Sequence, residues 1–150
     1  MKKLMVFAVL LFAGITAMGQ EKAEPTEKAN TVYVTVNLSA AEAFDRLFET
    51  LEDEGYEIED TIESRFRLRT ELRRLGAGEI ALRVGVVERD EEVQIRFRGR
   101  VSLLEYPTRE LRERFELENR RNKRSPVGQG FREMERLARM FGDDITYERK

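Results

Sequence analysis

The sequence predicts an α+β domain in which two helices pack on one face of an antiparallel sheet of about five strands. In several segments apolar residues alternate with polar ones, which is the pattern of half-buried strands. Two other segments repeat apolar residues at intervals of three and four, which indicates amphipathic helices. The order is strand, helix, four strands, helix, and a chain of 150 residues is long enough for one self-supporting core.

The first strand is predicted to begin at Thr31, and its inward residues are Val32, Val34, Val36 and Leu38. A helix follows at once. Ser39 and Glu42 have the spacing of a capping box, in which the Ser hydroxyl accepts from the Glu amide and the Glu carboxylate reaches back. The apolar stripe of this helix consists of Phe44, Leu47, Phe48 and Leu51. Gly55 suits the left-handed cap that ends a helix.

Residues 58–72 alternate again, with apolar side chains on one parity and charged ones on the other. This segment is long for a single strand, since about 5–6 residues is usual. We therefore expect a hairpin that bends through a three-residue loop at Glu63–Arg65. The pairs expected from that loop are Ile62 with Phe66 and Glu59 with Arg69.

A second hairpin is predicted from residues 80–86 and 93–101, whose apolar side chains also alternate. A two-residue turn at Arg89–Asp90 joins the two strands in this interpretation. The pairs expected from it are Val86 with Val93 and Leu82 with Phe97.

The rest of the chain holds one clear element. Residues 106–125 carry few apolar side chains and are expected to form a solvated excursion, in which Thr108 can cap a short helix. A helix is predicted from Ser125-Pro126 to Gly142, and Gly128-Gln129-Gly130 is expected to loosen its start. Its apolar face consists of Phe131, Met134, Leu137, Ala138 and Phe141. Two further apolar residues, Ile145 and Tyr147, are expected to dock the tail.

The element order and the stretch VNLSAAEAFDRLFETLEDEGYEI resemble the TATA-binding-protein-like and helix-grip domains of bacterial envelope proteins. These include C-terminal domains of an outer-membrane assembly lipoprotein. The resemblance covers roughly residues 31–142 and implies a binding or scaffold module. It carries over no site residue, and the chain departs from those lipoproteins because it has no cysteine to accept a lipid.

The first nineteen residues have the order of a secretory signal peptide. Lys2 and Lys3 precede an apolar run from Leu4 to Ala13, and small residues stand at the end, in Ala17-Met18-Gly19. The alternative is a membrane anchor, but spanning a bilayer takes about 20 apolar residues and this run is shorter. We expect a signal peptide over residues 1–19, a flexible polar linker over 20–30 and a single domain over 31–150. The protein would then be periplasmic or secreted, without a stable membrane anchor after cleavage.

Composition argues against several classes of function. The chain has 27 Lys and Arg against 29 Asp and Glu, so it lacks the net basic charge of a general nucleic-acid binder. It has neither histidine nor cysteine, which excludes a His-based triad, a thiol nucleophile and a His/Cys metal site. Its acidic clusters lie at predicted helix ends and turns, where acids are common. We therefore expect a non-enzymatic protein with no catalytic residue, no cofactor and no metal ion.

One surface has two interpretations. The predicted registers place six arginines on the sheet face opposite the core: Arg67, Arg69, Arg83, Arg96, Arg98 and Arg100. The same alternation places Arg73 there. An antiparallel sheet can simply expose such a charged face to solvent. Alternatively, guanidinium groups suit carboxylates and phosphates, and the face would bind another envelope protein or an anionic envelope component.

A different class of function is a carrier of a small apolar ligand or lipid between the helices and the sheet. The aromatic and apolar side chains that would line such a cavity are Phe44, Phe48, Phe131, Met134 and Phe141. Close packing of these side chains in an ordinary core is the simpler interpretation.

Overall fold

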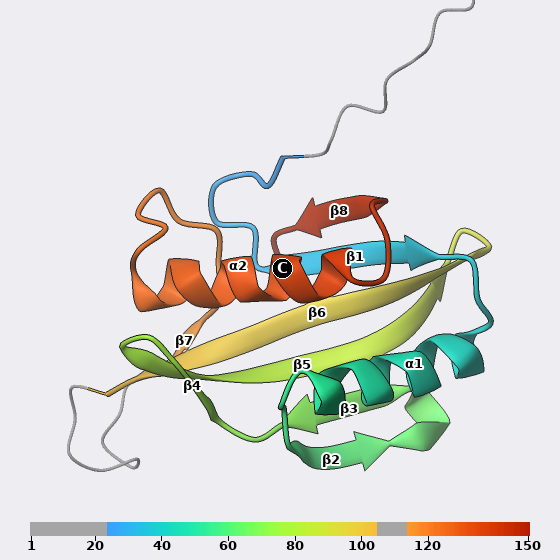
Figure 1. Cartoon of the computed structure of the whole chain (residues 1–150). Coiled ribbons are helices and arrows are strands. Elements are labelled where there is room, and N and C mark those ends of the chain that lie inside the picture. Colours follow the sequence, from blue (N-terminus) through green and yellow to red (C-terminus); the bar gives the residue numbers. More distant parts are fainter. Residues whose placement is uncertain (1–23, 105–113) are drawn as a thin grey trace, which may run out of the picture.

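A computed structural model describes residues 24–104 and 114–150 of the chain. Two helices and eight strands make up the described part, and the strands form one antiparallel sheet (Figure 1). The elements are β1 (Thr31–Val36), α1 (Ala40–Asp53), β2 (Ile58–Ile62), a 3-10 turn (Glu63–Arg65), β3 (Arg67–Thr70), β4 (Arg73–Leu75), β5 (Gly78–Arg89), β6 (Glu92–Leu103), β7 (Arg114–Glu116), α2 (Pro126–Arg139) and β8 (Ile145–Glu148). The α+β class is confirmed, whereas the expected number of about five strands is wrong.

The sheet is built around the two long strands β5 and β6, each of 12 residues. Its main order is β2-β3-β5-β6-β1-β8, and the short strands β4 and β7 pair with β5 and β6. The first strand of the chain thus lies between β6 and the last strand, although β1 and β8 stand at opposite ends of the sequence (Figure 1).

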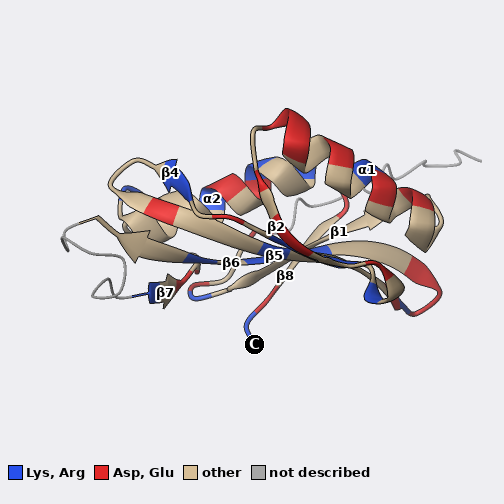
Figure 2. Ribbon diagram, turned by 90° about the horizontal axis from the view of Figure 1, so that it is seen from below, with Lys and Arg blue, Asp and Glu red and all other residues tan. Residues whose placement is uncertain are grey.

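Both helices lie on the same side of the sheet, as the edge-on view in Figure 2 shows. The core fills the space between the helices and the sheet. Its largest fully buried side chains include Leu47 of α1, Phe131 of α2, Leu82 of β5 and Phe97 of β6. The 3.6-residue and two-residue periodicities of the sequence therefore assign the inward faces of these elements correctly. The opposite sheet face, which we call the outer face, carries no helix of the described part.

The caps of α1 are confirmed. The Ser39 hydroxyl accepts from the Glu42 backbone N–H at 3.3 Å, and the Glu42 carboxylate accepts from the Ser39 backbone N–H at 2.9 Å. Gly55 has φ +82°, the left-handed conformation that glycine adopts without steric strain.

The first hairpin differs from its predicted register by one residue. Its loop has four residues, because the 3-10 turn is followed by Phe66 in a left-handed conformation at φ +48°. Phe66 packs against Phe44 of α1, with 5.7 Å between ring centroids, and this contact takes the extra residue out of the ladder. Ile62 therefore pairs with Arg67 instead of Phe66 and lies on the outer face, 43% exposed.

The same shift changes the partner of Arg69. It lies opposite Asp60 and not Glu59, although its Nε atom is still 3.9 Å from the Glu59 carboxylate. The pairing is irregular between Ile58 and Asp60. This irregularity restores Ile58 to the core side, where it packs against buried residues.

The second hairpin differs by two residues. Its turn is Asp90–Glu91, with φ +52° and +65°, and not Arg89–Asp90. Val86 therefore pairs with Ile95 instead of Val93, and Leu82 pairs with Gly99 instead of Phe97. Because side chains alternate with a period of two, a shift of two residues leaves every residue on its predicted face.

Three short strands were missing from the prediction. β4 is separate from β3, and β7 lies inside the expected excursion. The expected docking of the tail is confirmed as β8, in which Ile145 pairs with Val34 and Tyr147 with Val32. Thr108, which was expected to cap a short helix, is one of residues 105–113, and these lie outside the described residues.

α2 begins at Pro126 after a Ser125 cap and ends at Arg139, three residues before the predicted end. Its two glycines are buried inside the helix and do not loosen its start. A Cβ on Gly130 would lie 2.3 Å from the Leu117 side chain, and one on Gly128 would lie 2.7 Å from the Asn122 carbonyl oxygen. These glycines therefore let α2 pack closely against the segment between β7 and α2.

The predicted signal peptide, residues 1–19, lies outside the described residues. Of the predicted linker, residues 24–30 are described, and their end contacts the segment after β7. Lys28 N–H donates to the Asn119 carbonyl at 2.8 Å, and Asn119 N–H donates to the Ala29 carbonyl at 2.7 Å. In the described ranges, neither helix is long and apolar enough to cross a membrane.

Candidate functional site on the outer sheet face

The six predicted arginines all lie on the outer face. They come from three adjacent strands: β3 gives Arg67 and Arg69, β5 gives Arg83, and β6 gives Arg96, Arg98 and Arg100. We call this set the arginine face. The strand alternation explains it, because residues between these arginines, such as Leu68, Val84 and Phe97, are buried in the core.

Arg73 does not belong to the arginine face, contrary to the prediction. It lies opposite Ile80 on the helix side of the sheet, and its guanidinium carbon is 4.5 Å from the centroid of the Tyr56 ring. The chain leaves the sheet at Glu71 and Leu72 between β3 and β4, and this interruption reverses the parity of the residues that follow.

Three arginines lie directly opposite one another on three neighbouring strands. Arg69 pairs with Arg83, and Arg83 pairs with Arg98. Neighbouring strands are about 4.7–4.9 Å apart, and like charges directly opposite are destabilising. The register that gives the core its packing therefore forces three positive side chains into a single row.

The ends of this row are neutralised but its centre is not. Arg69 pairs with Asp60 at 3.2 Å, and Arg98 pairs with Glu116 at 3.4 Å. Arg83, between them, forms no ion pair with another described residue. The same holds for Arg67, Arg96 and Arg100 within the described ranges. The acidic residues of α1 lie on the other side of the sheet, as the red segments of that helix show (Figure 2).

The arginine face is hollowed in two places. The large hollow has a volume of about 580 Å³, and five arginines line it together with a single acid. Its lining consists of Asp60, Ile62, Arg67, Leu68, Arg69, Arg83, Val84, Arg96 and Arg98. The small hollow, of about 100 Å³, adjoins it, because Arg83 and Arg98 line both.

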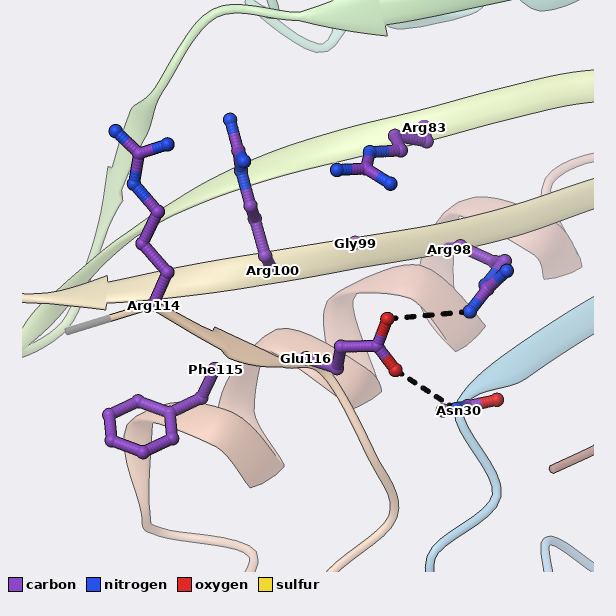
Figure 3. Close-up of a pocket in the computed structure, with 8 residues that line it drawn as sticks. All are labelled: Asn30, Arg83, Arg98, Gly99, Arg100, Arg114, Phe115 and Glu116. Atoms are coloured by element: carbon purple, nitrogen blue, oxygen red, sulfur yellow. Dashed lines mark hydrogen bonds and ion pairs between the residues drawn. The ribbon is translucent and has the colours of Figure 1, made fainter. Parts of the chain in front are cut away.

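Figure 3 shows the small hollow, where β7 meets β6. The Glu116 carboxylate accepts from Arg98 at 3.4 Å and from the Asn30 side chain at 3.1 Å. Burial lowers the pKa of Arg100, and the nearby charges of Arg114 and Arg83 lower it further. Four arginines and one acid line this hollow, so positive side chains predominate there.

Asn30, Arg114 and Glu116 were missing from the predicted site. Asn30 was assigned to the linker, and the other two belong to β7. The sequence signal of β7 is the alternation of Phe115 and Leu117 with charged residues, and this is too short for a strand prediction.

Two buried polar atoms of the outer face lack a hydrogen-bond partner among the described residues. They are Arg96 Nε and Gln94 Oε1. Buried donors are almost always satisfied in folded proteins. Arg96 also lines the large hollow.

The acidic clusters lie where the sequence predicted, at the end of α1, in the β5–β6 turn and before β8. Among the residues that the structure describes, no group of three Asp or Glu side chains could hold a metal ion.

The sequence matches no protein-family model, and no curated protein is similar to it at a significant level. The resemblance to envelope domains accordingly stays an expectation.

Proposed function

We propose that this chain is an exported, non-enzymatic binding module of the bacterial cell envelope and that its arginine face binds an anionic partner. The central support is the Arg69–Arg83–Arg98 row. A cross-strand row of like charges breaks a rule of sheet stability, and proteins break such rules mainly at functional sites. An anionic partner would relieve the repulsion and would gain charge-assisted hydrogen bonds.

The distribution of charge supports the same proposal. The whole chain is slightly acidic, with a formal net charge of −2, whereas the arginine face is strongly positive. Such a local field attracts an anionic partner without making the protein a general polyanion binder. The partner in this proposal is another envelope protein or an anionic envelope component.

A pull-down from envelope extract tests this function. Arg83, Arg96 and Arg98 are changed together to Glu, and we expect this variant to lose the partners that the wild type retains. The matched control changes Arg121, Arg124 and Arg132 to Glu, because these exposed residues lie in the segment before α2 and on α2. The net charge changes equally in both variants. Identical partners for the wild type and the face variant would rule out the arginine face as the site.

A second candidate function, transport of an apolar ligand, has a separate observation in its favour. A hollow of about 670 Å³ lies between α1 and the β2–β3 loop, and Phe44, Phe48 and Phe66 line it. The predicted ligand-lining residues of α2 do not contribute, since Phe131 and Met134 are buried in the packed core.

Native mass spectrometry of protein purified from its own envelope distinguishes the two functions. A bound apolar adduct that is lost on Phe48→Asp would support a carrier. A mass equal to that of the chain alone would argue against one, and it would leave the pull-down result to decide on the arginine face.

A further inference from the structure

We propose that the large hollow of the arginine face is a binding site for a phosphomonoester group, with Arg83 and Arg96 as its main donors. This inference rests on the proposed function and names the chemistry of the anion. The unpaired guanidinium groups around the hollow and their origin on three strands carry it, and the unused Arg96 N–H adds to it.

A glycine beside the large hollow lets β3 lie close against β5. Gly85 of β5 lies between Arg67 of β3 and Arg96 of β6 in the sheet register. A Cβ at Gly85 would lie 3.2 Å from Arg67 Cγ and 3.0 Å from the Phe66 carbonyl oxygen. The Arg67 side chain therefore lies over Gly85, and both Arg67 and Arg96 line the large hollow.

The unpaired guanidinium groups suit a group with several oxygens and two charges. A carboxylate is planar, presents two oxygens and is satisfied by one bidentate arginine. In the row, Asp60 already forms an ion pair with Arg69, and Glu116 forms one with Arg98, each through one carboxylate oxygen. Arg67, Arg83 and Arg96 remain around the hollow, and they come from three different strands. A terminal phosphate offers three oxygens and nearly two negative charges to such a set.

The buried Arg96 Nε atom adds a directional requirement. Its N–H is removed from solvent and has no acceptor among the described residues. An oxygen of a ligand in the hollow can accept from this N–H once the side chains that cover the atom move, and the ligand then satisfies a donor that is otherwise costly to bury. Lysine cannot replace arginine here, because an ammonium group is a point charge without the planar fork.

Isothermal titration of the purified chain with two dianions of different shape tests the proposal. The probes are sn-glycerol 3-phosphate and succinate at neutral pH. We expect saturable binding of glycerol phosphate and at least about tenfold weaker binding of succinate. Arg83→Lys and Arg96→Lys keep the net charge but should each weaken the binding of glycerol phosphate about tenfold. Arg132→Lys is the matched control, since Arg132 is exposed on α2, and it should change nothing.

A second arm distinguishes a soluble phosphate from a lipid headgroup. Phosphatidylcholine vesicles with and without phosphatidic acid are sedimented with the wild type and with Arg83→Lys. Binding to phosphatidic acid that is lost in the variant assigns the phosphomonoester to a lipid. Binding of glycerol phosphate without vesicle binding assigns it to a soluble compound.

Two results would overturn the inference. One is equal affinity for succinate and glycerol phosphate, and the other is the absence of binding to both phosphate probes. Neither result decides the proposed function, because the pull-down with the charge-reversed face tests that independently.

Discussion

At the scale of the residue, single side chains show how this chain uses carboxylates to stabilise its helices. The Glu42 carboxyl accepts hydrogen bonds from the Ser39 backbone N–H and from the Ser39 hydroxyl, and these lower its pKa below the ordinary value of 4.5. Tyr56 is 3% exposed, and its hydroxyl donates to Glu133 of α2 at 2.9 Å. Burial and the neighbouring Glu133 raise the pKa of Tyr56. In both cases a glutamate carboxylate accepts a hydrogen bond from a defined donor, Ser39 for Glu42 and Tyr56 for Glu133.

The lowered pKa of Glu42 predicts a pH-dependent contribution to stability. A group whose pKa falls on folding stabilises the fold above its unfolded pKa, and the stabilisation is lost as the pH falls through the folded value. Glu42→Gln keeps an oxygen acceptor but cannot ionise. We therefore expect this variant to unfold at lower urea concentration than the wild type at pH 7 and at the same concentration near pH 2. A difference that persists unchanged in acid would contradict the assignment.

Removal of the Tyr56 hydroxyl should destabilise the junction between α1 and α2. Tyr56→Phe leaves the Glu133 carboxylate without one donor in a partly buried site, and hydrogen bonds to charged groups contribute about 1.5–3 kcal/mol. We expect a loss near the lower end of this range, because Glu133 keeps its bond to Arg136. Urea denaturation measures it. Tyr147→Phe, at a more exposed Tyr–Glu pair, is the control and should cost less.

At the scale of the element, turn geometry decides registers that hydrophobic periodicity leaves open. The β5–β6 turn holds Asp90 and Glu91 in left-handed conformations, which L-residues other than Asn and Asp rarely adopt. The sequence therefore lacks the Asn-Gly or Asp-Gly signal that marks such a turn. The first hairpin also lacks a turn signal in its sequence. Its left-handed residue is Phe66, and the contact with Phe44 stabilises this conformation.

Glu91→Gly should stabilise the β5–β6 hairpin. Glycine adopts positive φ without the penalty of about 1 kcal/mol that other residues incur. We expect the free energy of unfolding to rise by up to about 1 kcal/mol, measured by chemical denaturation. Glu92→Gly is a matched control one residue later, at the start of β6, where glycine should destabilise the strand. Stabilisation by both changes would mean that the turn conformation is not the cause.

Gly130→Ala should destabilise the protein, although alanine favours helices by about 1 kcal/mol over glycine. The new Cβ would meet the Leu117 side chain, which is fully buried and has little room to move. Overpacking of this kind typically costs about 1–3 kcal/mol. The thermal midpoint measures the net effect, and a gain in stability would show that Leu117 can rearrange freely.

At the scale of the whole molecule, the sequence predicted the faces of the sheet better than its connections. The α+β class and the sharing of one face by Arg67, Arg83 and Arg98 follow from period-two alternation, which a two-residue register error does not disturb. Arg73 was misplaced because the break at Glu71 and Leu72 has no signal in the alternation. The pairing of arginines across strands depends on the strand registers, and so does the hollow. The alternation of apolar and polar residues does not determine these registers.

Deletion of residues 143–150 should destabilise the whole fold and not only its end. This deletion removes β8 and leaves β1 with an unpaired edge next to the core. It also removes Ile145, which is 5% exposed, and the hydrogen bonds between Lys150 and Asn30. We expect loss of a cooperative thermal transition. Arg149→Ala, a change at an exposed residue in the same segment, should keep it.

The position of β1 between β6 and β8 has a consequence for the time course of folding. Val32 near the start of the domain pairs with Phe97 on one side and with Tyr147 on the other, so both ladders of β1 close long loops. Contacts of such high sequence separation slow folding. A growing chain can assemble α1 and the two hairpins early, but β1 gains its second neighbour only after residues 145–148 have been made. Formation of the β1–β8 ladder is therefore expected to be the last step in assembling the described sheet.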